Sequence, residues 1–322
     1  MRRVLACSVV LIVLAGCGGQ DSPSASPAST TTVATSSTLP APTPPYAVLT
    51  RTETLIDTSR VTPATGESPE KPSRTLQTTI IYPDAPGPFP LIVFSHGLTG
   101  TPDRHTEMSS AWARAGYVVA MPAFPLTNAS VPNGSANAGD VKNQPGDVSF
   151  VIDRMLSDNT TASSPLFGRI LADRIGVAGH SLGGATTYAV AENDCCRDDR
   201  VDAVIIMSGI RLVDLDHEHL DRMPPVLMFH GDADPLLNVS IADAIYPQLG
   251  TPKWFVRLLG AGHAPAYENT PSPWDSVVTA TSTDFWQAYL PPTAGAPDPA
   301  ILARLRTDAV VDTISTLQAD PG

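Results

Sequence analysis

One segment constrains the fold more than any other: a strand pattern, a turn of small residues and a helix pattern follow one another between residues 174 and 192. The stretch Ile175-Gly176-Val177-Ala178 is apolar throughout, as a strand buried on both faces requires. It runs directly into Gly179-His180-Ser181-Leu182-Gly183. Small residues on both sides of Ser181 allow a turn sharp enough to expose its hydroxyl at the start of the next helix. The segment therefore predicts a layered arrangement of strands and helices.

Strand and helix patterns alternate along the rest of the chain. Strands are expected at 46–58, 75–83, 90–94, 117–123, 174–180, 201–208, 225–230 and 253–260. Helices are expected at 103–115, 147–156, 182–192, 239–248, 276–290 and 298–318, and residues 124–146 form a long loop of Asn, Gly, Pro and Ser. This alternation predicts an α/β fold with a mostly parallel central sheet of about eight strands and helices on both faces.

The N-terminal residues have the features of an export signal. Arg2 and Arg3 precede a mostly apolar run, 4–15, which is too short to span a bilayer. Leu14-Ala15-Gly16-Cys17 resembles the lipobox of bacterial lipoproteins. The resemblance implies that residues 1–16 are removed and that Cys17 carries acyl chains, so we expect an exported, extracytoplasmic protein anchored to the bacterial cell membrane. The alternative is an ordinary cleaved signal beside a chance cysteine.

The remaining chain divides into a tether and one domain. Ser, Thr and Pro make up 18 of the 28 residues in 18–45, which cannot bury enough apolar surface to offset the entropy of ordering. We therefore expect residues 17–45 to be a disordered tether and 46–322 to be a single folded domain. The net charge of −12 and the presence of only three lysines argue against nucleic acid as a partner. No pattern indicates an oligomeric state.

The turn around Ser181 resembles the nucleophile elbow of the α/β-hydrolase fold; the alternative is a surface serine in a glycine turn. A serine hydroxyl is inert near neutral pH without a base, so a histidine and an orienting acid must follow. In this fold the acid precedes the histidine along the chain. His263 ends Gly260-Ala261-Gly262-His263, directly after an expected strand. The carboxyl end of a strand is where an open parallel sheet usually carries its catalytic residues.

The acid has several candidates. Asp234 is preferred because the turn Gly231-Asp232-Ala233-Asp234 after the strand at 225–230 resembles the family pattern. Asp232 is the first alternative. Asp214 and Asp216, which follow the preceding expected strand, are further alternatives. A tetrahedral oxyanion also needs two fixed N–H donors. We expect these to be the backbone amides of Leu182 and of Leu98, in the loop after the first buried strand.

Four motifs, SHGLTG, GHSLGG, GDADP and GAGH, all within 91–265, together resemble the bacterial cutinase and polyester-hydrolase family. They equally resemble the platelet-activating-factor acetylhydrolase and dienelactone-hydrolase relatives. The resemblance implies a serine esterase with Ser181, Asp234 and His263 as its triad and an acyl-enzyme intermediate, without cofactor or metal. The implied substrates are short or medium acyl esters, lipids or polyesters, so the partner is a small-molecule or polymeric ester. Two alternatives remain: a serine peptidase of the same fold, and a non-catalytic lipoprotein binding module on a hydrolase scaffold.

The sequence also departs from that family. Leu98 stands where polyester hydrolases usually have an aromatic clamp, and Ile210 stands where many have Trp. Together with Leu236 these residues predict an apolar cleft without a stacking platform, which favours aliphatic acyl groups. The stretch between the strands at 208 and 225 is too short for a large cap domain. The site is therefore expected to be open unless loop 124–146 folds over it.

The remaining reactive side chains have structural interpretations. His96, His180 and His230 lie in strand-end turns, and His105 is expected on a helix surface. The acidic stretch around His217-Glu218-His219 is interpreted as a solvated loop rather than a metal site. Cys195 and Cys196 are adjacent and have three possible states: a strained vicinal disulfide, which is rare, two free thiols, or a bond to another molecule. Their place after the elbow helix suggests a structural turn.

Overall fold

The computed structural model describes residues 43–66, 68–132, 135–211 and 219–322. The expected signal, Cys17, most of the tether, and the candidates Asp214 and Asp216 lie outside these ranges. So do His217 and Glu218. Among the described residues, no helix combines the length and the apolar character needed to cross a bilayer.

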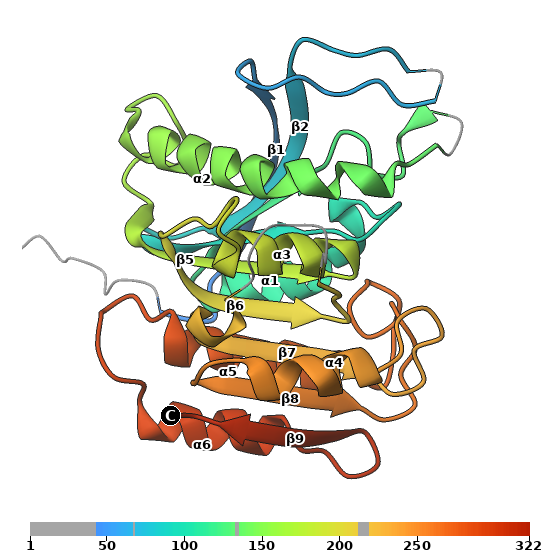
Figure 1. Cartoon of the computed structure of the whole chain (residues 1–322). Coiled ribbons are helices and arrows are strands. Elements are labelled where there is room, and N and C mark those ends of the chain that lie inside the picture. The colour runs from blue at the N-terminus through green and yellow to red at the C-terminus, as the bar shows by residue number, and fades with distance from the viewer. Residues whose placement is uncertain (1–42, 67, 133–134, 212–218) are drawn as a thin grey trace, which may run out of the picture. The chain divides into compact units, whose positions relative to one another are not determined.

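The centre of the domain is a single sheet of nine described strands (Figure 1). The strands are β1 (Val48–Asp57), β2 (Arg74–Pro83), β3 (Phe89–Ser95), β4 (Val118–Ala123), β5 (Ile170–His180), β6 (Val201–Met207), β7 (Val226–Gly231), β8 (Lys253–Leu258) and β9 (Ser315–Asp320). Their order is β1-β2-β4-β3-β5-β6-β7-β8-β9. Strands β3 to β8 are mutually parallel, whereas β1, β2 and β9 pair antiparallel with their neighbours. The expected mostly parallel sheet is confirmed, with nine strands rather than about eight.

Helices cover both faces of this sheet (Figure 1). They are α1 (Thr106–Arg114), α2 (Gln144–Thr160), α3 (Leu182–Glu192), α4 (Ser240–Ile245), α5 (Asp275–Tyr289) and α6 (Pro299–Asp308). Buried side chains of α2, α3 and α4 pack on one face, and those of α1, α5 and α6 pack on the other.

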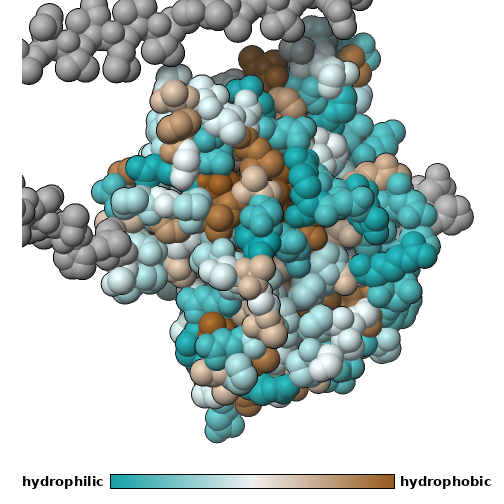
Figure 2. Space-filling view, turned by 90° about the vertical axis from the view of Figure 1, so that its left-hand side faces the viewer, coloured by the Kyte–Doolittle hydropathy of each residue, from teal (hydrophilic) through white to brown (hydrophobic). Residues whose placement is uncertain are grey.

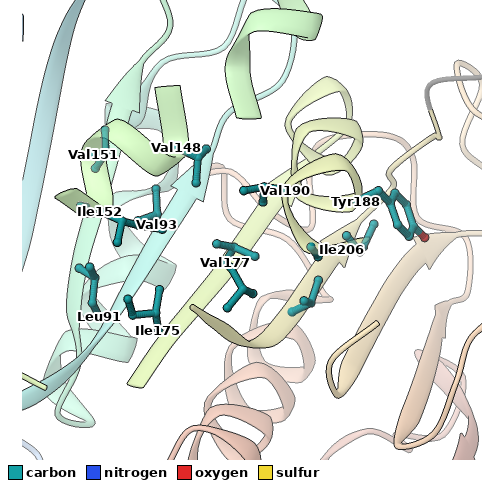
Figure 3. Close-up of a cluster of buried hydrophobic side chains, with 14 of the residues drawn as sticks. Leu91, Val93, Val148, Val151, Ile152, Ile175, Val177, Tyr188, Val190 and Ile206 are labelled. Atoms are coloured by element: carbon teal, nitrogen blue, oxygen red, sulfur yellow. The ribbon is translucent and has the colours of Figure 1, made fainter. Parts of the chain in front are cut away.

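The core beneath α2 and α3 illustrates why the parallel strands are apolar throughout (Figure 3). Val177 of β5 points to this core, together with Val148 of α2 and Val190 of α3. The next residue, Ala178, joins the core on the opposite face. Because successive residues of a strand alternate between the two faces, a sheet covered on both sides needs apolar side chains at every position.

The expected helix at 298–318 is wrong in its second half. Helix α6 ends at Asp308, and residues Ser315–Asp320 form β9, which pairs antiparallel with β8. This edge strand alternates between covered and exposed positions, and its partner lies about 60 residues earlier in the chain. A local pattern does not report a pairing of that kind, because the strand is defined by its hydrogen bonds to β8.

The long loop before α2 is held down by buried charges. It contains the short 3-10 helix Ala138–Asn143, and α2 begins at Gln144, three residues earlier than expected. Arg74 of β2 forms ion pairs with Asp140 and Asp147, at 2.9 and 2.6 Å, and all three side chains are buried. The loop is thus attached to the sheet rather than free.

Figure 2 shows the edge of the molecule at which the parallel strands begin, where hydrophobic residues gather in a patch among hydrophilic ones. Phe167, 55% exposed, lies in the connection that leads into β5 at this edge. The predicted site residues follow the opposite, C-terminal ends of the strands.

Candidate active site

Ser181 lies in a strained turn between β5 and α3. Its backbone φ is 55°, a left-handed conformation that is uncommon outside glycine and that is enriched at functional sites. Close packing explains the flanking glycines. A Cβ atom at Gly183 would overlap the carbonyl oxygen of Ser95, and one at Gly179 would overlap the carbonyl oxygen of Gly183. The sequence therefore folds into the sharp turn that its small residues predict.

The three residues predicted as nucleophile, base and acid form one chain of hydrogen bonds. The Nε2 atom of His263 lies 2.7 Å from the Oγ atom of Ser181. The Nδ1 atom of the same ring lies 2.6 Å from Oδ2 of Asp234. Since a carboxylate only accepts, Nδ1 carries the hydrogen and Nε2 accepts from the serine hydroxyl. The three side chains come from the ends of β5, β7 and β8, which lie at the same edge of the sheet.

Asp234 is held in its ionised form by donors on both oxygens. Burial raises the pKa of this carboxyl, but the N–H groups of Leu237 and Leu236 and the His263 ring outweigh burial, so its pKa lies below the ordinary value. The two backbone N–H groups donate to Oδ1 at 2.9 and 2.8 Å. The alternative acid, Asp232, instead accepts the N–H of Gly260 at 2.7 Å and stabilises a turn.

The backbone N–H groups of Leu98 and Leu182, beside Ser181, have no acceptor among the described residues. The loop residue Gly97 approaches the serine so closely that a Cβ on it would lie 3.1 Å from the Ser181 Cβ. The next two amides of this loop are occupied, because Thr99 donates to the Thr127 carbonyl and Gly100 donates to the Gly97 carbonyl. Leu98 and Leu182 thus present free donors next to the hydroxyl.

A pocket of about 480 Å³ opens over Ser181. Its apolar lining comes from Leu98, Ile210, Leu236 and Leu237, and Leu236 is 72% exposed at its mouth. The pocket is also lined by Arg104, Glu268 and the following residues: Gly97, Thr99, Gly100, His180, Ser181, Leu182, His263 and Ala264. No described residue of loop 124–146 is part of this lining.

Two charged residues of this pocket were not predicted from the sequence. Arg104 and Glu268 face each other at 3.6 Å, although they are far apart in the chain. Neither belongs to a motif, and the fold alone brings the 3-10 helix Pro102–His105 next to the connection after β8. No local signal could have indicated this pair.

The expectation that His105 lies on a helix surface is wrong. It ends the short 3-10 helix before α1, is 1% exposed, and donates from Nδ1 to the carbonyl of Tyr267 at 2.9 Å. Burial lowers its pKa to about 4. The 3-10 turn points the ring toward Phe94 and the sheet, with ring centroids 4.6 Å apart.

His180, one residue before the serine, is also buried. It donates from Nε2 to the carbonyl oxygen of His263 at 2.9 Å, and burial lowers its pKa to about 3. The ligand atoms of His105, His180 and Glu268 lie within 4.8 Å of one another. Two of the three already have partners, because His180 donates to the His263 carbonyl and Glu268 pairs with Arg104. We therefore assign no metal site to this group.

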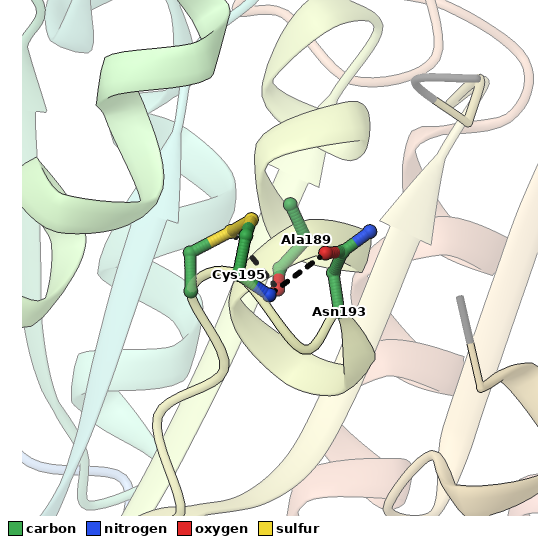
Figure 4. The surroundings of a disulfide bond; sticks show 4 residues. Ala189, Asn193 and Cys195 are labelled. Atoms are coloured by element: carbon green, nitrogen blue, oxygen red, sulfur yellow. Dashed lines mark hydrogen bonds between the residues drawn. A yellow bond between two sulfur atoms is a disulfide. The ribbon is translucent and has the colours of Figure 1, made fainter. Parts of the chain in front are cut away.

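The adjacent cysteines form a disulfide bond, the rare outcome among those considered (Figure 4). The pair follows the C-terminal end of α3, whereas Ser181 precedes its N-terminal end. The backbone N–H of Cys195 donates to the side chain of Asn193 at 3.1 Å, and the Cys196 sulfur contacts the carbonyl of Ala189. The disulfide is thus part of the turn that follows this helix.

Comparisons with known proteins agree with this architecture. The model of the dienelactone hydrolase family matches residues 76–291, about two thirds of the chain. Cutinase est2 of Thermobifida alba is 28% identical over 188 residues, which cover 58% of this chain and 56% of that relative. The chain therefore matches only a little over half the length of this curated relative. The matched family, together with the nine-stranded, mostly parallel sheet and its helical layers, confirms the expected α/β-hydrolase fold and places the chain in the dienelactone hydrolase family of hydrolases.

Proposed function

We propose that this hydrolase cleaves carboxylic esters through Ser181, His263 and Asp234, by way of an acyl-enzyme. The proposal rests above all on one observation: the hydrogen-bond chain from the Ser181 hydroxyl through His263 to Asp234, with contacts of 2.7 and 2.6 Å, at the base of an apolar pocket. This arrangement activates a hydroxyl that would be inert alone.

In the first half of the reaction, the Ser181 Oγ attacks the ester carbonyl carbon while His263 Nε2 takes its proton. Asp234 keeps the ring oriented and stabilises the imidazolium that forms. The tetrahedral intermediate then collapses, the C–O bond to the alcohol breaks, and His263 returns the proton to the departing oxygen. In the second half, His263 removes a proton from water as the water attacks the acyl carbon. The bond from that carbon to the Ser181 Oγ then breaks, His263 returns the proton to this oxygen, and the acid leaves.

Negative charge develops on the former carbonyl oxygen during both halves. The free N–H groups of Leu98 and Leu182 are the donors we assign to it. Donors that are fixed in advance stabilise this charge better than water does, because they need no reorganisation as the charge forms. The loss of one such donor lowers the rate about 10²- to 10³-fold.

The pocket lining supports aliphatic acyl groups of short or medium length. Leu98, Ile210 and Leu236 offer apolar surface without an aromatic ring. The large exposure of Leu236 leaves the mouth open to bulky esters, including lipids and polyesters. The similarity to a protein named as a cutinase is compatible with esters of that kind.

The deciding experiment compares wild-type protein with the Ser181→Ala variant and a Ser163→Ala control, whose serine is exposed in a loop. We expect p-nitrophenyl butyrate hydrolysis and fluorophosphonate labelling to be lost only in Ser181→Ala. Undiminished turnover in that variant would contradict the proposal. A wild-type protein that neither turns over esters nor takes the label would support the binding module, and faster cleavage of a peptide amide than of the ester would support the peptidase.

We further propose that the protein is exported and held on the bacterial membrane through acylated Cys17. The basis is the sequence Leu14-Ala15-Gly16-Cys17 after an apolar run. In a bacterial host, fatty-acid labelling and membrane fractionation should both be positive for the wild type and negative for Cys17→Ser. Equal labelling of the two proteins would overturn the anchor.

A further inference from the structure

His96 is a buried histidine between β3 and the loop that approaches Ser181. It is 1% exposed, and its ring is packed against Phe124 with centroids 5.1 Å apart. Its two nitrogens have different partners. Nδ1 lies 2.7 Å from the carbonyl oxygen of Gly97, and Nε2 lies 3.1 Å from the backbone N–H of Phe124.

These partners fix the state of the ring. A carbonyl oxygen can only accept, so Nδ1 carries a hydrogen, and a backbone N–H can only donate, so Nε2 must be a free lone pair. His96 is therefore neutral, with its hydrogen on Nδ1. Burial favours the same state, because it lowers the pKa of this imidazole to about 4.

The carbonyl that accepts from His96 belongs to a particular peptide group. The Gly97 carbonyl and the Leu98 N–H are the two ends of one planar trans peptide, so they point in opposite directions. A second donor, the N–H of Gly100, reaches the same oxygen at 2.9 Å. With its oxygen held on one side by two donors, this peptide must turn its N–H to the other side.

That other side is the pocket. Gly97 lies against the Ser181 side chain, both Gly97 and Leu98 line the pocket, and the Leu98 N–H has no acceptor among the described residues. Phe124, which anchors the far nitrogen of His96, directly follows β4. The ring thus ties the loop to the end of a neighbouring strand.

We propose that His96 is a positioning residue for the oxyanion site: its Nδ1–H holds the Gly97–Leu98 peptide so that the Leu98 N–H points at the oxygen of the tetrahedral intermediate. The inference rests on the proposed ester hydrolysis and adds a residue that touches neither substrate nor reacting atoms. Because the oriented N–H is needed most when charge develops, its loss lowers kcat and leaves KM nearly unchanged.

Two substitutions separate the nitrogens of His96. In His96→Asn, the amide nitrogen lies as many bonds from Cβ as Nδ1 does, so it can donate to the Gly97 carbonyl, while the acceptor for Phe124 is lost. In His96→Gln, the amide oxygen lies as far along the side chain as Nε2, so it can accept from Phe124, while the donor to Gly97 is lost. Each variant keeps one contact and removes the other.

We expect kcat for p-nitrophenyl butyrate to fall about 10- to 100-fold in His96→Gln, since a misdirected donor loses part or all of its effect. His96→Asn should retain kcat within about threefold, and KM should stay within about twofold in both variants. The second-order rate of fluorophosphonate labelling should follow kcat, because that reaction also builds negative charge on an oxygen at this place.

Urea unfolding of both variants provides the structural comparison. If His96 only supports the fold, activity should fall in proportion to lost stability, and His96→Asn should suffer as much as His96→Gln. That result, or a change confined to KM, would overturn the proposal. A variant pair in which His96→Asn is the less active would also overturn it. Failure of the underlying function looks different, because Ser181→Ala would then retain activity whatever the His96 variants do.

Discussion

The Nε2 atom of His263 lies 2.7 Å from the Oγ atom of Ser181, although 82 positions separate the two residues in the chain. Their contact depends on β5 and β8, which are parallel members of one sheet with β6 and β7 between them. Loops that follow parallel strands emerge at the same edge, and the connection after β8 is long enough to reach back over the intervening strands.

The acid of the proposed triad can be tested with a matched pair of neighbouring carboxylates. Asp234→Asn keeps the shape of the side chain but removes the charge that orients His263, so kcat should fall about 10³- to 10⁴-fold. Asp232→Asn changes a carboxylate that accepts the Gly260 N–H and stabilises a turn, so activity should stay within about threefold. Steady-state kinetics on p-nitrophenyl butyrate would reveal the opposite order if Asp232 were the acid.

The apolar mouth of the pocket should set the preference for acyl length. Leu236→Ala removes three carbon atoms from an exposed apolar wall, at about 0.8 kcal/mol for each buried CH₂ that loses its contact. We expect kcat/KM to fall about 3- to 10-fold for p-nitrophenyl octanoate and to change little for the acetate. Leu49→Ala, at an exposed position of β1, is the control. An equal loss for both esters would show that Leu236 does not contact the acyl chain.

Removal of the Arg74 side chain should lower the free energy of unfolding of the domain. Arg74→Met would leave the buried carboxylates of Asp140 and Asp147 without their main cation. Breaking a buried pair in this way costs about 3–5 kcal/mol of unfolding free energy. The triple variant Arg74→Met/Asp140→Asn/Asp147→Asn removes all three charges and should recover part of the loss in urea titrations. No difference between the single and triple variants would contradict this explanation.

Stability should decline as the pH falls from about 6.5 toward 4. Burial lowers the pKa values of His96 and His105 to about 4 and that of His180 to about 3, whereas an unfolded histidine titrates near 6.5. Between these values the unfolded chain binds more protons than the folded one, so each buried histidine lowers the unfolding free energy by up to about 1.4 kcal/mol per pH unit. The stability that these neutral histidines contribute is fully present above pH 6.5.

His105→Phe isolates one of these contributions, since Phe cannot bind a proton and suits the apolar contact with Phe94. The slope of urea-derived stability against pH should be smaller in this variant than in the wild type between pH 6.5 and 4.5. Identical slopes would mean that His105 does not remain neutral in the folded protein.

The Cys195–Cys196 disulfide should contribute little to overall stability. A crosslink stabilises mainly by restricting the unfolded chain, and the restriction grows with the length of the closed loop. Here the two cysteines are adjacent, so almost no loop is closed. Cys195→Ala/Cys196→Ala should change the unfolding free energy by less than about 1 kcal/mol, as measured by urea titration without reductant. A loss of several kcal/mol would show that the ring supports the end of α3 directly.

Much of the fold could be predicted because its signals are local. The apolar runs of β3 to β8 and the small residues around Ser181 follow from burial on two faces and from close packing, and both are properties of consecutive residues. Strand β9 was missed since it is half exposed and exists through its pairing with β8. His105 was placed on a surface because nothing in its neighbours indicates the 3-10 turn that buries it.

The sequence by itself determined the class of fold, the turn that presents Ser181, and the candidate residues Asp234 and His263 with their order in the chain. Only the tertiary structure decided that Asp234 rather than Asp232 meets His263, that Arg104 and Glu268 line the pocket, and that His96 holds the Gly97–Leu98 peptide. The physical reason is that the local backbone conformation depends on neighbouring residues, whereas the contacts of a side chain depend on how distant strands pack. A turn can therefore be read from five residues, but a hydrogen bond across 82 positions requires the assembled sheet.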